Sequence, residues 1–586
     1  ATQARGEGYF RLEWKLAVDR SHLMAPDQPF LLPVVIDDTP DAAARVADEF
    51  RAVQWTRLPA GETSAAFCAR VQLLLTGSLM EPGRPRPGKR GEGDAAPTVA
   101  PLPPSPALVE KSVAVLAFAN LSPDPDNEYF SDGLSEDLIS MLGRVPGLTV
   151  RGRTSAFSFK GKNVPMPEIA RQLGVTYIVR GSVRKAGHRV RVSAQLTRAA
   201  DDAVVWSSEP LERELKDVFA VQDELVALIA KNLSLRLGGA ARANRTVNPE
   251  AHRLVLEGQY FWNRGSQADM DRGEAAFVQA AAIDPESAEA HAGLAKVTVL
   301  RNLYRCVDGS PDDQAELQSA RKAAERAVAL DPRNPDALAV QATAYMLERK
   351  LSESEARFQE AIALNPNATL PRLWHGLLLA NRGQLAAAIA ENAKAIELDP
   401  LWFPPLQLHA LLMLDAQRFT EALQFTARAA AARGEVYVTN LLYRIAALRG
   451  LGRDEEAVAV ARSVRTRLTD QPRWAADCMA IEALRHAGQP GEAEAYATEL
   501  LALVPPEAVI VRGLIPFVLG CFDEALPLLG KMPVTTRRSL FWHQFWDPVR
   551  DDSRFHQLLR TIGCAEDYTV ARAELTRMRA MQVAKP

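Results

Sequence analysis

Six carboxylates between Asp124 and Asp137 come nearest, in type and spacing, to an active site or a metal site. They surround the aromatic pair Tyr129-Phe130. A calcium-binding loop needs acidic or amide residues at alternate positions, a glycine at the sixth position and a glutamate at the twelfth. Here Pro125 interrupts the alternation, and no glycine occupies the sixth position. The spacing therefore argues against a calcium site.

The same stretch is typical of the start of a helix. Ser131 or Asp132 is placed to cap the N-terminus, and Glu136 and Asp137 put negative charge into the first turns. The predicted buried face consists of apolar residues at helical spacing: Leu134, Leu138, Met141 and Leu142. A catalytic carboxylate pair needs an apolar pocket that raises the pKa of one member. We expect a solvated loop here, so we interpret the cluster as structural.

Other groups capable of chemistry are dispersed. The five cysteines form no CxxC pair, which indicates structural thiols in a reducing compartment. No HExxH, GxxxxGK[ST] or GxSxG motif is present, and no GxGxxG lies between a strand and a helix. Seven histidines are scattered through the helical part of the chain: His252, His291, His375, His409, His486, His543 and His556. The sequence predicts no catalytic residue, no metal site and no cofactor.

Length and charge limit the classes of protein to which the chain can belong. A chain of 586 residues is too long for one core and predicts three to four domains. A net charge of −3 argues against a chain that coats nucleic acid or an anionic membrane, so no nucleic-acid partner is predicted. No apolar run is long enough for a transmembrane segment. We expect a cytoplasmic, multidomain protein.

A repeat over 248–535 is the strongest pattern in the chain. Pro332, Pro366 and Pro400 are 34 residues apart and close the phrases ALDP, ALNP and ELDP. Small residues such as Gly376 and Ala388 recur at packing positions and allow two helices to approach closely. These residues resemble the tetratricopeptide repeat, in about eight units. The resemblance implies an all-α solenoid with a partner-binding groove.

A capping segment is expected after the repeats, over 536–586. It carries the aromatic stretch FWHQFWDPVRDDSRF, which starts at Phe541. Terminal units of a solenoid close its open end, so these aromatic side chains are predicted to pack there. A peptide-binding aromatic patch is the alternative interpretation.

A small α/β domain is predicted over 110–238. Strands are expected at 112–118 and 148–153, a hairpin at 175–196, and helices at 166–174 and 217–233. The alternation of valine and arginine over 189–192 predicts one wet sheet face. AVLAFANLSPDPDNEYFSDGLSEDLISML and IARQLGVTYIVRGSVRKAGHRVRVSAQL resemble the TolB amino-terminal-like domain of bacterial signalling proteins. That family implies recognition or coupling and provides no catalytic residues.

Residues 1–76 resemble the second half of a TIR domain, which has a flavodoxin-like α/β fold. The resemblance rests on GYFRLEWKLA (8–17), FLLPVVIDD (30–38), FRAVQWTRLP (50–59) and AAFCARVQLLL (65–75). The first strand and the helix with the catalytic glutamate of NAD-cleaving members would lie before Ala1, so we expect a truncation there. Glu13 belongs to a different helix. A Pro- and Gly-rich linker follows over 77–109.

The sequence thus predicts a signal-transduction scaffold that binds a protein or peptide in the repeat groove, coupled to a TIR-type module. Groove candidates on the first helices of the repeats are Tyr345, Arg372 and His375. TIR–TIR self-association is a further contact that the resemblance implies. An NAD+ nucleosidase in a longer chain is the alternative from the enzyme class. A regulator of transcription or of cyclase output is the second alternative, although no winged helix or cyclase domain is visible.

Overall fold

The structure, a computed structural model, describes the following residues: 34–35, 56–57, 109–122, 127–186, 189–214, 218–233, 248–264, 266–308, 314–433, 438–467, 474–506, 508–531 and 544–583. The chain divides into two compact units, 1–100 and 101–586. In the first unit β1 (Val34–Val35) pairs in parallel with β2 (Thr56–Arg57). Both lie in segments expected to hold strands of the TIR-like block. The rest of that block lies outside the described residues, and its assignment stays a prediction.

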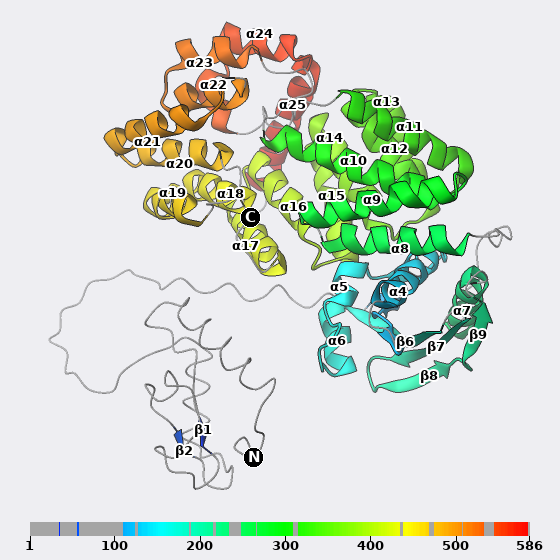
Figure 1. The fold of residues 1–586 in the computed structure, drawn as a ribbon. Coiled ribbons are helices and arrows are strands. Elements are labelled where there is room, and N and C mark those ends of the chain that lie inside the picture. Colours follow the sequence, from blue (N-terminus) through cyan, green and yellow to red (C-terminus); the bar gives the residue numbers. More distant parts are fainter. Residues whose placement is uncertain are drawn as a thin grey trace, which may run out of the picture. The chain divides into compact units, whose positions relative to one another are not determined.

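A mixed sheet forms the first part of the second unit (Figure 1). Its strand order is β5-β3-β6-β7-β8, with β4 on β6 and β9 on β7. β3 is parallel to β5 and β6, whereas β7 runs antiparallel to β6, β8 and β9. The strands are β3 (Val109–Val115), β4 (Ala119–Asn120), β5 (Thr149–Val150), β6 (Val175–Ala186), β7 (Arg189–Arg198), β8 (Ala203–Ser207) and β9 (Leu211–Glu214).

Helices pack on both faces of this sheet. α4 (Glu128–Leu142) and α7 (Val218–Asn232) cover one face, and α6 (Met166–Leu173) covers part of the other. Gly174 ends α6 at φ 61°, as predicted. A short helix that the sequence does not predict, α5 (Arg153–Phe157), follows β5.

The alternation along β7 is confirmed. Val190 and Val192 are buried, whereas Arg189 and Arg191 are exposed. The predicted hairpin of β6 and β7 is also present, and its pairing runs from Tyr177 to Ala186 on the first strand. The sequence does not predict β8 and β9, which extend the sheet beyond the hairpin.

The predicted cap of α4 is wrong. The helix begins at Glu128, so Ser131 and Asp132 lie inside it and are buried. Ser135 also lies inside the helix. Its Oγ donates to the carbonyl of Ser131 and accepts the N–H of Phe118. The predicted buried face is confirmed for its three leucines, whereas Met141 is only partly buried. Asp124 and Asp126 lie outside the described residues.

Consecutive helical hairpins follow the α/β domain in the second unit (Figure 1). Pro332, Pro366 and Pro400 fall between one hairpin and the next, and Gly376 lies close to Ala388 of the paired helix. The helices are α8 (Pro249–Arg264), α9 (Gln267–Ile283), α10 (Ala288–Asp308), α11 (Gln314–Leu330), α12 (Pro335–Leu347), α13 (Leu351–Leu364), α14 (Thr369–Asn381), α15 (Leu385–Leu398), α16 (Phe403–Asp415), α17 (Phe419–Arg433), α18 (Val438–Gly450), α19 (Asp454–Arg467), α20 (Trp474–His486), α21 (Pro490–Leu503), α22 (Val509–Val518) and α23 (Phe522–Leu529). Among the described residues, no helix is both long and apolar enough to cross a membrane.

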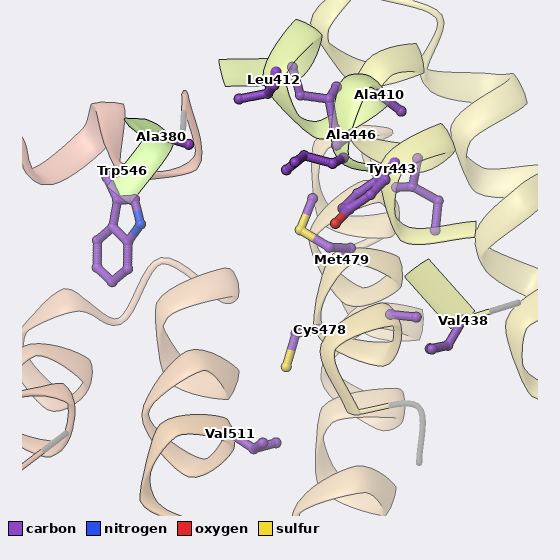
Figure 2. Close-up of a cluster of buried hydrophobic side chains, with 14 of the residues drawn as sticks. Ala380, Ala410, Leu412, Val438, Tyr443, Ala446, Cys478, Met479, Val511 and Trp546 are labelled. Carbon is purple, nitrogen blue, oxygen red and sulfur yellow. The ribbon is translucent and has the colours of Figure 1, made fainter. Parts of the chain in front are cut away.

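The core of this solenoid is continuous across repeats. Figure 2 shows Tyr443 of α18 and Cys478 and Met479 of α20 among its buried side chains. The core extends into the C-terminal segment, which consists of η7 (Gln544–Val549), α24 (Ser553–Thr561) and α25 (Ala565–Val583). Trp546 and Phe555 are fully buried there, and their ring centroids are 5.4 Å apart. These two aromatic side chains therefore pack inside the protein.

Candidate functional site

The groove candidate Arg372 is engaged within its own repeat. Its Nη1 lies 2.5 Å from Oε1 of Glu391, and its Nε and Nη2 donate to the carbonyl of Pro366 at 3.1 and 2.9 Å. The side chain is 12% exposed. Arg372 thus ties α14 to the preceding loop and to α15, and its role in a groove stays a prediction.

His375 and Tyr345 occupy different environments. His375 is 8% exposed, and its ring centroid lies 5.8 Å from that of Phe358. Burial lowers the pKa of His375, so its imidazole is neutral at pH 7. Tyr345 is partly buried, with Nζ of Lys350 5.5 Å from its ring centroid. The three candidates therefore do not share one environment.

The first helices of two central hairpins offer little open surface. Every residue of α14 and α16 is buried or partly buried. The second helix of the preceding hairpin differs, since α13 exposes Glu353 and Glu360. A side chain must be accessible to hold a partner. The helices α14 and α16 therefore offer a partner less contact area than the exposed side of α13 does.

Asp399, in the loop between α15 and α16, is the centre of a contact with the α/β domain. Its carboxylate accepts the N–H of Thr154 at 3.2 Å and the N–H of Ser155 at 2.8 Å, both in the first turn of α5. It also accepts the Ser155 hydroxyl, whose oxygen in turn accepts the N–H of Leu401 at 2.9 Å. Burial raises the pKa of Asp399, and these donors oppose the shift. The neighbouring Gly152 leaves no room for a Cβ beside this carboxylate.

Arg151 joins the same two parts of the chain. It is 1% exposed, and its guanidinium donates three hydrogen bonds to backbone carbonyls. Two go to the C-terminus of α6, at Leu173 (2.6 Å) and Gly174 (3.0 Å), and the third goes to Glu397 at the end of α15 (2.6 Å). The positive charge therefore lies at the C-terminal ends of two helices, where their dipoles favour a cation.

The loop between α13 and α14 makes a second contact with the α/β domain. Nδ2 of Asn367 donates to the carbonyls of Gly143 (2.8 Å) and Leu148 (2.9 Å), and its Oδ1 accepts the N–H of Val150 (3.0 Å). Nδ2 of Asn365 donates to the carbonyl of Ser140 at 3.2 Å. Two successive inter-repeat loops thus hold the part of the α/β domain around β5.

The C-terminal segment contacts the other ends of these repeats. Arg349, in the turn between α12 and α13, donates to the carbonyls of Ile562 (3.1 Å) and Gly563 (3.0 Å). Glu574 of α25 accepts the N–H of Ala386 at 2.9 Å, at the start of α15. The hairpins from α12 to α15 are therefore held at both ends, by the α/β domain and by the C-terminal segment.

The carboxylate cluster around α4 forms ion pairs. Nζ of Lys160 lies 2.5 Å from Glu128 and 2.6 Å from Asp132, and Nε of Arg153 lies 2.9 Å from Glu136. Burial raises the pKa of Asp132, and the hydrogen bond from Lys160 opposes this shift. The expected solvated environment is therefore wrong for Asp132, although its contacts agree with the predicted structural role. In the described part of the chain, no group of His, Cys, Asp and Glu could hold a metal ion.

Comparison with known proteins gives partial similarities. No family model matches the chain. A protein of Rhizobium meliloti (strain 1021) described as "Putative adenylate cyclase 3" is 33% identical over 263 residues. The match covers 44% of this chain and 44% of that protein, so the chain spans less than half the length of this curated relative.

Solved structures with partial similarity include tetratricopeptide repeat proteins. One, from Parabacteroides merdae ATCC 43184, is 14% identical, with a TM-score of 0.33, over 46% of this chain and 100% of that chain. Another, a thermophilic protein of Thermus thermophilus, is 21% identical, with a TM-score of 0.29, over 34% of this chain and 99% of that chain. The class of the present protein follows from its own helices: it is a helical-repeat solenoid with a small α/β domain docked on its loops.

Proposed function

We propose that the chain is a signal-transduction scaffold whose tetratricopeptide-type repeats bind a protein partner, while the TolB-like domain is coupled rigidly to those repeats. The observation that supports this most directly is the buried contact of Asp399 with Ser155 and of Arg151 with Glu397. Hydrogen bonds to buried charged groups hold a defined geometry, because breaking one leaves an uncompensated charge. A partner that displaces the repeats would therefore displace the α/β domain as well.

Affinity purification with the full chain and with two deletion variants tests this proposal. Loss of residues 248–586 should remove the bound proteins, because it removes the solenoid together with the segment that packs on it. Loss of residues 1–108 serves as the control and should leave those proteins bound. If the set of bound proteins is the same after deletion of 248–586, the repeats do not recruit the partner and the scaffold proposal fails.

Regulation of cyclase output is a second candidate function, and it is supported by the similarity to the Rhizobium meliloti protein. In this proposal the α/β domain and the repeats act as the regulatory part of a nucleotide cyclase system. Expressing the chain in a cyclase-dependent reporter strain should change cyclic AMP levels, and the Asp399→Ala variant should change them less. Equal cyclic AMP with and without the chain would reject this function.

The TIR-type module is proposed from the sequence alone. Its coupling to the scaffold, its self-association and a cytoplasmic location are expectations of the resemblance over 1–76. The NAD-cleaving alternative concerns a longer chain, and incubation of the purified protein with NAD+ tests it for this one. Unchanged NAD+ would reject the enzyme function for these residues and leave the scaffold function standing.

A further inference from the structure

The sheet has one face that its helices cover only in part. Val179 and Val183 of β6 and Val190 and Val192 of β7 point to the core under α4 and α7. The opposite face contacts α6 near β3 and the start of β6. Beyond that point the face carries polar residues at alternate positions: Arg180, Ser182 and Arg184 from β6, and Arg189, Arg191, Ser193 and Gln195 from β7. We call these seven residues the arginine face.

Two arginines on this face lie directly opposite each other. In the antiparallel register Arg184 is paired with Arg191, and both are exposed. Like charges in directly opposite cross-strand positions repel and destabilise the sheet. Glu212 offsets this repulsion on the Arg191 side, and an anion between the two guanidinium groups would offset it on the Arg184 side.

The carboxylates nearby neutralise only part of the arginine face. Glu212 of β9 is shared by Arg191, at 2.8 Å, and Arg189, at 3.2 Å. Glu214 follows on the same strand, opposite Arg189 in the register.

The arginines of β6 have fewer acidic neighbours. Arg180 donates to Oε1 of Gln195 at 3.1 Å, which is a neutral acceptor. Among the described residues of β6, β7 and β9, this face carries four arginines and two glutamates. The excess positive charge is therefore concentrated at Arg180 and Arg184.

We propose that the arginine face binds an extended acidic peptide segment of a protein partner, with carboxylates at alternate positions. Alternate residues on a strand lie about 7 Å apart, so Arg180 and Arg184 are about 13 Å apart along β6. Ser182 and Ser193 face each other between the arginines and add hydroxyl donors. An extended peptide has the same spacing along one side, so its carboxylates match the rows of donors. This surface is separate from the repeats and goes beyond the scaffold proposal.

Other polyanions fit this face less well. Sites for single-stranded nucleic acid combine a basic track with aromatic side chains on which bases stack. None of the seven residues is aromatic. Anionic membranes attract broad clusters of basic residues, whereas Glu212 and Glu214 border this face on one side. A peptide that carries a few carboxylates avoids both conflicts.

Fluorescence anisotropy with a labelled peptide of alternating Glu and Ala, about ten residues long, tests the proposal. The full chain should bind this peptide at low ionic strength, and added salt should weaken binding. Arg184→Gln combined with Arg191→Gln should weaken binding by at least about tenfold. Arg171→Gln is the control, because Arg171 is an exposed arginine on α6 that pairs with Glu168. It should leave binding unchanged.

A thermal melt separates binding from folding. Arg184→Gln removes the like-charge pair, so the midpoint should stay constant or rise by about 1 °C while the peptide binds less tightly. A lower midpoint would assign Arg184 a structural role and contradict the proposal. Failure of the wild-type chain to bind the acidic peptide would overturn it. So would equal weakening by Arg171→Gln, or tighter binding of an oligothymidylate of the same length.

Discussion

Asp399 in the loop after α15 and Ser155 in the first turn of α5 are joined by two hydrogen bonds, from the backbone N–H and the hydroxyl of Ser155. The two residues are 244 positions apart in the chain. Asp399 belongs to the phrase ELDP, which ends a repeat helix. A residue that marks a helix end in the sequence therefore also holds the α/β domain on the solenoid.

Replacing Asp399 should loosen this contact. In Asp399→Ala the N–H groups of Thr154 and Ser155 lose their acceptor while the interface stays buried, so the free energy of unfolding should fall by about 2–4 kcal/mol. Urea denaturation measures this change. Hydrogen exchange should also increase at residues 152–157, because α5 loses the acceptor for its first-turn N–H groups.

Asp331→Ala is the matched control for this variant. Asp331 occupies the same place in the phrase ALDP, and its Oδ1 accepts the N–H of Arg333 in its own loop. That substitution should cost about 1 kcal/mol and leave exchange at 152–157 unchanged. Equal effects of the two variants would show that Asp399 acts only within its loop.

Asp331 and Asp399 also show how far the sequence can predict this protein. The 34-residue spacing and the alternation in β7 predict helices and a strand because they reflect burial that repeats along the chain. The helix end at Gly174 is local as well, since φ 61° favours glycine. The two aspartates occupy the same place in nearly identical phrases, however, and differ in what folds against them. The coupling contact is therefore not visible in the sequence.

For the groove candidates and the cap of α4, too, the sequence does not show what packs against each residue. Helix position alone suggests Arg372 and His375 as groove residues, and it says nothing of Glu391 and Phe358, which contact them from neighbouring helices. Serine and aspartate favour caps, so composition alone places the start of α4 at Ser131 or Asp132. The helix starts earlier because the residues before Ser131 pack as part of it, with Phe130 2% exposed.

His409 should make the solenoid less stable in mild acid. Burial lowers its pKa from 6.5 to about 4, with Arg418 and Arg428 nearby and Asn392 at 3.2 Å from Nδ1. Between these values the unfolded chain binds a proton that the folded chain does not, so stability falls as the pH falls from about 6.5 to about 4. The loss from His409 at pH 5 should be about 2 kcal/mol.

Urea denaturation of the wild-type chain and of His409→Gln at about pH 7.5 and pH 5 measures this effect. Glutamine keeps a polar side chain beside Asn392 but does not titrate in this range. The variant should lose less stability than the wild type between the two pH values, and the buried His375, whose pKa is also lowered, contributes to the loss that remains. An identical loss in both proteins would mean that His409 does not contribute to the pH dependence.

Gly383 should control the docking of α25. Its φ is 73°, and an added Cβ would lie 2.7 Å from the backbone nitrogen of Ala571. Gly383→Ala should therefore increase hydrogen exchange across 565–580 and expose this helix to proteolysis. Gly452→Ala is the control, because Gly452 has φ 70° in the corresponding turn before α19 but no neighbour within 4 Å. The left-handed backbone costs both variants about 1–2 kcal/mol, so only a difference at α25 reports the contact. Unchanged protection of α25 in Gly383→Ala would contradict the docking.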